Sequence, residues 1–221
     1  MGKLIVIDGL DGSGKGTQTR ALVKYLEEKG MQAKRIDFPR YGTKGATLVE
    51  GYLKGELGGN PDDTGAYATS LFFAMDRYWS YRTDWGEFYS APDSVLVLDR
   101  YTTANAVHQC SKLPRDEWDG FLTWLWDTEY NKIGIPKPDK IIFLDMKPSI
   151  VRSLIDSRSQ NENRAKDIHE KDSTYLDRCY EAALYACEML GWEHICCYEG
   201  EKPRAMEDIF ADILSCLKDV L

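Results

Sequence analysis

The sequence predicts an α/β fold with three layers, α/β/α, built around a five-stranded parallel sheet. Short apolar runs alternate along the chain with longer segments of helical periodicity. The apolar runs at 95–98 and 141–144 contain no alternating polar positions, which is typical of strands covered on both faces. A glycine-rich segment also separates the first apolar run from the first helical segment.

Each element follows from these patterns. The strands are expected at Lys3–Asp8, Ala33–Phe38, Ser94–Asp99, Lys140–Asp145 and His194–Tyr198. Helical periodicity lies near 15–29, 44–57, 65–84, 103–131, 148–190 with an interruption, and 205–219. Neither internal repeats nor a linker composition is evident, so residues 1–221 are expected to form a single domain.

Composition narrows the function classes. The 28 Lys and Arg residues against 36 Asp and Glu residues give a net charge of −8, which argues against a nucleic-acid or membrane surface as partner. None of the six cysteines forms a Cys-x-x-Cys pair, so spacing typical of a metal site is absent. With neither a signal-peptide pattern nor an apolar stretch of about 20 residues, we expect a soluble, cytoplasmic protein.

The glycine-rich segment, residues 9–17, predicts a phosphate-binding loop. Its glycines let several backbone N–H groups point at one anion, and the following helix adds its positive dipole end. Lys15 is placed to reach the β- and γ-phosphates of a nucleoside triphosphate. The expected ATP-binding residues are Gly9, Asp11, Gly12, Ser13, Gly14, Lys15, Gly16, Thr17 and Gln18. A glycine-rich turn without a ligand is the alternative.

One position of the loop departs from the usual pattern. The residue after the lysine is normally Ser or Thr, whose hydroxyl helps to hold Mg²⁺. Here it is Gly16, and the hydroxyl follows at Thr17. The order from Gly14 to Gln18 resembles that of nucleoside monophosphate kinases.

Charged residues follow the expected strands at the edge where parallel α/β sheets bind ligands. The second strand leads into Arg40, the third into Asp99 and Arg100, and the fourth ends at Asp145. Arg40, Arg77 and Arg100 are candidates to hold phosphate, because a guanidinium can make paired contacts to phosphate oxygens. A surface salt bridge is the alternative for any one of them.

A pair of helical residues and one strand residue are further candidates for ligand binding. Phe73 and Arg77 share a helix face at a spacing of four, so one could stack on a base while the other holds the same nucleotide. One of Phe72 and Phe73 is expected to be core. Asp99 follows four apolar strand residues, where a carboxylate is costly unless it serves a cation or a hydrogen bond, so it is a candidate metal ligand with Thr17.

The segment 157–167 is polar apart from one alanine. A solvated loop is the ordinary interpretation. Its two arginines, Arg158 and Arg164, favour a mobile lid over about 152–170 in a chain that handles phosphate.

These blocks resemble the thymidylate kinase family, and the resemblance runs along nearly the whole chain. It rests on the loop at 9–15, on 38–40, on 71–77, on 99–109, and on the acidic pattern at 167–172. The resemblance implies that Asp11 approaches the sugar 3′-hydroxyl, that Asp99 serves the metal, and that Asn105 and Gln109 face the thymine. The residues it implies for dTMP binding are Asp11, Phe38, Pro39, Arg40, Phe73, Arg77, Arg100, Asn105 and Gln109.

Three positions depart from the family pattern. Ala104 stands where a Ser is frequent, and His108 stands where an aromatic residue helps to exclude a 2′-hydroxyl. A plain helix residue is the alternative reading of His108. Gly12 replaces the catalytic arginine that some members carry in the loop, so the lid arginines Arg158 and Arg164 are the expected source.

The predicted function is transfer of the γ-phosphoryl group of ATP to dTMP, with Mg²⁺, and the resemblance suggests a homodimer. The expected catalytic residues are Lys15, Asp99, Arg100, Arg158 and Arg164. A kinase with another acceptor, such as dUMP or AMP, is the nearest alternative. A nucleotide-dependent switch that hydrolyses its ligand slowly is the alternative of another class, and a purely structural module is a third.

Overall fold

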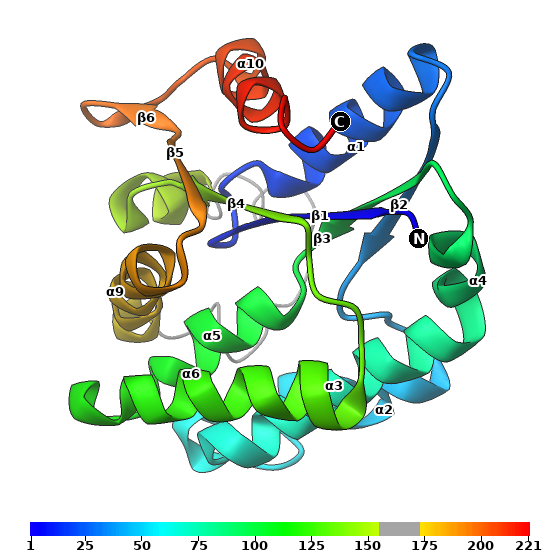
Figure 1. Cartoon of the computed structure of the whole chain (residues 1–221). Coiled ribbons are helices and arrows are strands. Elements are labelled where there is room, and N and C mark those ends of the chain that lie inside the picture. Colours follow the sequence, from blue (N-terminus) through cyan, green and yellow to red (C-terminus); the bar gives the residue numbers. More distant parts are fainter. Residues whose placement is uncertain (155–172) are drawn as a thin grey trace.

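The computed structural model describes residues 1–154 and 173–221. Its main sheet has five parallel strands in the order β2-β3-β1-β4-β5 (Figure 1). Their bounds are β1 Lys3–Gly9, β2 Gln32–Asp37, β3 Ser94–Asp99, β4 Lys140–Asp145 and β5 Glu193–Cys196. A two-stranded hairpin, β6 Tyr198–Glu199 and β7 Lys202–Pro203, follows β5. The predicted fold class is confirmed.

The central strands are buried on both faces because their side chains point alternately to two hydrophobic clusters. Leu4 and Val6 of β1 join a cluster that contains Trp85, whereas Ile5 and Ile7 join one that contains Leu22. β1 pairs with β3 on one side and β4 on the other, which brings the ends of all three strands to one edge.

Helices cover both faces of the sheet (Figure 1). α1 and α10 lie on the upper side, and α2, α3, α5 and α6 lie below. The bounds are α1 Lys15–Glu28, α2 Thr47–Leu53, α3 Ala66–Ser80, α4 Gly86–Ser90, α5 Thr102–Cys110, α6 Trp118–Trp126, α9 Ser173–Leu190 and α10 Met206–Cys216. Residues 148–154 are also helical.

The expected helix at 103–131 is divided into two. α5 ends at Cys110, and α6 begins at Trp118 after a short 3₁₀ turn at Arg115–Glu117. Pro114 lies in the break, where its ring and missing N–H oppose a continuing helix. α3 and α6 each continue into a π-helical turn, Tyr81–Trp85 and Asp127–Ile133.

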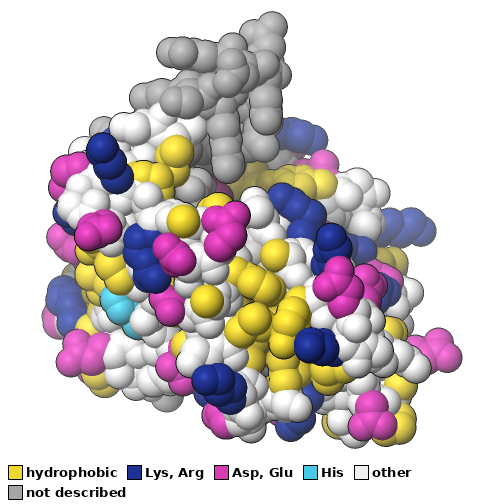
Figure 2. Space-filling model, turned by 90° about the horizontal axis from the view of Figure 1, so that it is seen from above, with side chains coloured by type: hydrophobic (Ala, Val, Ile, Leu, Met, Phe, Trp, Pro, Cys, Tyr) yellow, Lys and Arg dark blue, Asp and Glu magenta, His cyan; other side chains and the backbone are white. Residues whose placement is uncertain are grey.

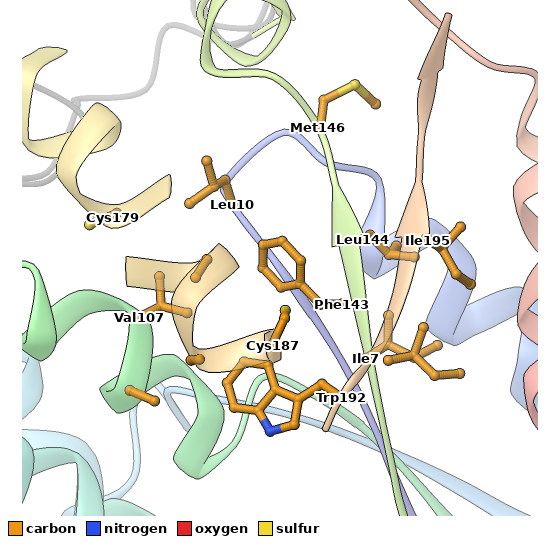
Figure 3. Packing of buried hydrophobic residues seen from close by; sticks show 14 of the residues in the cluster. Ile7, Leu10, Val107, Phe143, Leu144, Met146, Cys179, Cys187, Trp192 and Ile195 are labelled. Atoms are coloured by element: carbon orange, nitrogen blue, oxygen red, sulfur yellow. The ribbon is translucent and has the colours of Figure 1, made fainter. Parts of the chain in front are cut away.

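The larger core cluster extends over both faces of the sheet and includes residues of α1 and α10 as well as of α5, α6 and α9. Phe143 of β4 points into it beside Leu10, Cys187 and Trp192 (Figure 3). Leu10 belongs to the phosphate loop and is almost fully buried. Its packing in the core therefore anchors the loop to the rest of the domain.

The surface of α3 inverts the usual arrangement of an amphipathic helix. Its exposed large side chains are Tyr67, Leu71, Met75, Tyr78 and Trp79, each 39–43% exposed. The only charged residues of the helix, Asp76 and Arg77, are 1% exposed. The face seen from above looks different, with Lys, Arg, Asp and Glu side chains interspersed among the hydrophobic ones (Figure 2).

Among residues 1–154 and 173–221, no helix has both the length and the hydropathy needed to cross a bilayer.

Candidate active site

A cavity of about 420 Å³ opens where the parallel strands end, within the size range of ligand-binding clefts. It gathers most of the residues that the sequence singled out. Those lining it are Asp11, Gly12, Gly14, Lys15, Gly16, Thr17, Phe38, Pro39, Phe73, Arg77, Asp99, Arg100, Asn105 and Gln109. The structure therefore brings together segments of β1, β2, β3, α3 and α5 that are distant in the sequence.

The phosphate loop turns directly from β1 into α1. Gly14, just before the first helical residue, has a φ of 89°, a conformation open to glycine and strained for other residues. Lys15 Nζ donates to the Leu10 carbonyl at 3.1 Å and lies 3.3 Å from Asp11 Oδ1. Burial lowers the pKa of Lys15, and the positive charge of Arg100 acts in the same direction.

Asp11 and Arg100 form an ion pair in the middle of the cavity. Arg100 Nη2 donates to Asp11 Oδ1 at 2.6 Å. Although burial opposes ionisation, Arg100 and Lys15 hold the pKa of Asp11 well below its usual range. Arg100 has a φ of 65°, a strained backbone conformation for a residue with a side chain, so the turn after β3 aims its guanidinium inward.

His108 lines the cavity rather than lying on an ordinary helix surface. Its Nε2 lies 3.0 Å from Arg100 Nη1. Since a guanidinium can only donate, this nitrogen must accept, which places a neutral ring's proton on Nδ1. The ring stacks on Tyr175 of α9 with centroids 6.0 Å apart, so an aromatic side chain stands behind the histidine.

The far end of the cavity is built around a buried ion pair. Arg77 Nε and Nη2 donate to the two carboxylate oxygens of Glu129 at 2.7 and 2.5 Å, and each residue is 1% exposed. Asn105 Nδ2 donates to the same carboxylate at 3.1 Å, and Thr102 Oγ1 donates at 3.3 Å. Arg77 is thus electrically compensated before any ligand arrives.

Gln109 and Phe73 complete this end. Both polar atoms of the Gln109 amide are buried without a hydrogen-bond partner among the described residues, an unusual and costly condition that a ligand could relieve. Phe73 lines the cavity, whereas Phe72 does not. Of the two phenylalanines, Phe73 is therefore the one placed to contact a ligand in this cavity.

The opposite end holds the candidate metal ligands. Asp99 and Thr17 both line the cavity beside Gly16. Asp99 Oδ2 accepts a hydrogen bond from Arg35 Nη2 at 2.9 Å. One carboxylate and one hydroxyl fit Mg²⁺, which commonly takes one or two protein ligands together with water and substrate phosphates.

Four predicted residues do not line the cavity. Gly9 and Ser13 are buried within the loop, and Gln18 Nε2 donates to the Met206 carbonyl at 2.9 Å. The Arg40 guanidinium points to Asp84 at 2.7 Å and lies 3.8 Å from Asp37. Arg158, Arg164 and most of the expected lid lie outside the described residues.

The sequence analysis missed Glu129, Tyr175, Arg20 and Arg35. Glu129 lies in a helical run where nothing local marks it as the partner of a residue 52 positions away. Arg20 had a detectable signal, because it follows Thr17 at a spacing of three and so shares its helix face.

Comparison with known proteins bears on this site. The family model described as thymidylate kinase matches residues 7–203. A thymidylate kinase of Mycobacterium tuberculosis is 30% identical over 185 residues, covering 83% of this chain and 84% of the relative. The chain belongs to the thymidylate kinase family. The predicted family is thereby confirmed, and with it the enzyme class, an ATP:dTMP phosphotransferase.

Other members of the thymidylate kinase family agree. The thymidylate kinase of Danio rerio is 26% identical and covers all of this chain and 92% of its own length. A solved structure of thymidylate kinase from Candida albicans superimposes with a TM-score of 0.69 at 18% identity, covering 99% of this chain and 92% of that one. The structural match supports the shared fold.

Proposed function

We propose that the chain, as a single domain, transfers the γ-phosphoryl group of ATP to the 5′-phosphate of dTMP, yielding dTDP and ADP. The observation that carries this proposal is that the two ends of the cavity carry different groups. A phosphate loop with Lys15 forms one end, and the partly buried Phe73 with the buried Arg77 and Gln109 forms the other. The Asp11–Arg100 pair lies between them, where two phosphate chains would meet.

At the donor end, Lys15 and the loop amides would hold the β- and γ-phosphates. Thr17 and Asp99 would hold Mg²⁺, which when bound neutralises phosphate charge and helps to align the reacting groups. The acceptor phosphate is already an anion near neutral pH, so the residues need to position it rather than remove a proton. Arg158 and Arg164 of the expected lid are proposed to approach the transferred group.

At the acceptor end, Phe73 would stack on the base. The unpartnered amide of Gln109 offers one donor and one acceptor, which matches the adjacent carbonyl and N–H of a thymine edge. Glu129 already compensates Arg77, whereas Arg100 shares the single carboxylate of Asp11 with Lys15. Arg100 is therefore the stronger candidate for the acceptor phosphate. Arg40 could join it by giving up its exposed pair with Asp84.

We also propose a homodimer in which α3 faces its counterpart. The exposed residues of α3 are apolar or aromatic and uncharged over the whole helix, although the chain as a whole carries a charge of −8. A second copy of the same face would meet no like charge there. Light scattering should give the mass of a dimer for the wild type and of a monomer for Leu71→Glu.

The deciding experiment measures ADP formation from ATP and Mg²⁺ with dTMP, dUMP, the ribose form of TMP, AMP or thymidine as acceptor. We expect turnover that depends on dTMP. The comparison with the ribose form shows whether His108, backed by Tyr175, still enforces the sugar preference. ADP release independent of every acceptor would replace the kinase proposal with a nucleotide-hydrolysing switch.

A further inference from the structure

Among the residues that the structure describes, four Lys and Arg side chains line the cavity, and they differ in their partners. Lys15 and Arg100 share Asp11, and Arg77 pairs with Glu129. Arg20 also lines the cavity, yet it forms no ion pair within 4.0 Å among the described parts of the chain. Its positive charge is therefore the one that the neighbouring carboxylates leave uncompensated.

The position of Arg20 follows from helix geometry. It lies on the same face of α1 as Thr17, and helical side chains point back toward the N-terminus. Arg20 Nη2 consequently reaches Thr17 Oγ1 at 3.4 Å, beside the phosphate loop. The guanidinium is thus held over the first turn of α1, where the backbone N–H groups already attract an anion.

Gly16 keeps the space beside this guanidinium open. A Cβ atom at position 16 would lie 3.2 Å from Asp99 Oδ2 and 3.5 Å from Arg20 Nη1. The side chain usually found after the loop lysine would therefore crowd Asp99 and stand in van der Waals contact with Arg20. Its absence leaves a gap bordered by Asp99 and Arg20, next to the expected path of the donor phosphates.

Asp99 forms no ion pair with Arg20 and instead pairs with Arg35. Arg35 Nη2 donates to Asp99 Oδ2 at 2.9 Å, and Arg35 Nε donates to Thr19 Oγ1 at 2.9 Å. This second contact fixes the Arg35 guanidinium against α1. Arg20 therefore remains directed at the open cavity.

We propose that Arg20 binds the terminal phosphate of the nucleoside triphosphate donor, a role that rests on the proposed function for the identity of the donor. The guanidinium supplies charge-assisted hydrogen bonds to phosphate oxygens on the Thr17 side of the loop. Lys15 approaches the same phosphate group from the Asp11 side. The two cations enclose the terminal phosphate from opposite sides of the loop.

Calorimetric titration of the whole chain with ATP tests this role. Arg20→Gln should weaken ATP binding about tenfold or more, as expected for loss of a hydrogen bond to a charged group. The weakening should persist in EDTA, because the contact does not pass through a metal. Arg20→Lys should restore part of the affinity. The matched control is Lys24→Gln, the same charge change one turn further along α1, where Lys24 is exposed and pairs with Glu28.

Two readouts separate a phosphate contact from a general disturbance. AMP binding and dTMP binding should stay within about twofold of the wild type in Arg20→Gln, and its thermal midpoint should match that of Lys24→Gln. Unchanged ATP affinity, or equal losses for ATP and AMP, would overturn the assignment of Arg20. A wild-type protein that binds ATP but shows no dTMP-dependent turnover would overturn the proposed function instead, while an ATP-selective loss in Arg20→Gln would still support the phosphate contact.

Discussion

The two ends of the cavity hold their charges in different ways. At the acceptor end, Arg77 and Glu129 are buried, mutually paired and joined by Asn105. At the donor end, Thr17 and Arg20 are exposed, and Arg20 has no carboxylate partner among the described residues. A buried ion pair must be satisfied before the ligand arrives, because desolvation is costly. An exposed cation is solvated by water and needs no protein counter-charge before the ligand binds.

This difference indicates that the two ends of the cavity contribute differently to specificity and to binding. The acceptor end is preorganised, so its shape can discriminate between bases. Substitutions in its buried polar network should be destabilising for the same reason. At the donor end, Lys15 already pairs with Asp11 and Asp99 with Arg35, whereas Arg20 gains a charged partner only when phosphates bind. We expect the cations at this end to affect affinity and rate more than folding, because their main function is to contact phosphates.

The largest effect is expected for Glu129→Gln. It leaves Arg77 buried without a counter-charge, which should lower the free energy of unfolding by about 3–5 kcal/mol in urea denaturation. The double variant Glu129→Gln with Arg77→Met should regain much of that loss, since neither charge remains. A single variant within about 1 kcal/mol of the wild type would show that the pair is not a structural requirement.

Lys15→Met tests the donor end. Removing the cation that faces the phosphates should lower kcat by about 10²–10³-fold, while the unfolding free energy changes by about 1 kcal/mol or less. Lys24→Met on the same helix is the control for loss of a lysine. Near-normal turnover would remove Lys15 from the catalytic group.

Gln109→Leu should separate binding from stability at the acceptor end. The buried amide has no partner among the described residues, so replacing it with an apolar side chain should keep or raise the unfolding free energy. The KM for dTMP should rise about tenfold as hydrogen bonds to the base are lost. A destabilised variant with an unchanged KM would reverse this assignment.

Phe73→Ala and Phe72→Ala form a matched pair. Both rings pack against the cluster of Val49, Tyr52 and Leu53, so similar losses of stability are expected. Only Phe73 lines the cavity, and its loss should weaken dTMP binding by about 1–3 kcal/mol with much less effect on ATP. Equal weakening for both nucleotides would make Phe73 a core residue alone.

The smallest effect concerns Lys112, which supports the acceptor end from behind. Lys112 Nζ donates to Tyr52 Oη at 2.9 Å, and the Tyr52 ring lies against Phe73. Burial lowers the pKa of Lys112 to about 8, from 10.5. Between these pH values the unfolded chain binds the extra proton, so this group makes stability rise with pH.

Lys112→Met removes that contribution. The wild type should gain on the order of 1 kcal/mol relative to the variant between pH 8 and pH 10 in urea denaturation. The buried cysteines also titrate in alkaline solution, but they are common to both proteins and cancel in the difference. Parallel stability curves would mean that Lys112 keeps its ordinary proton affinity.

The sequence was sufficient for features whose cause is local. Strand β3 and the start of α1 were predicted to the residue, because an apolar run and a glycine-rich turn define them. The division between α5 and α6 was missed although Pro114 marks it. Glu129 could not be predicted, since its role depends on α3 and the turn after α6 meeting in space. Arg77, a candidate phosphate ligand in the sequence, lines the cavity, but its pairing with Glu129 could not be predicted from the sequence.

The uncharged outer surface of α3 has a consequence for which amino-acid substitutions this helix can accept. Its inner positions hold the cavity and its buried ion pair, while its outer positions form an uncharged face. Most surface helices keep at least one side where substitutions accumulate freely. α3 has no such side if its outer face is covered. A saturation mutagenesis screen should find that α3 accepts few replacements along its whole length, whereas α1 accepts many at its solvent-facing positions.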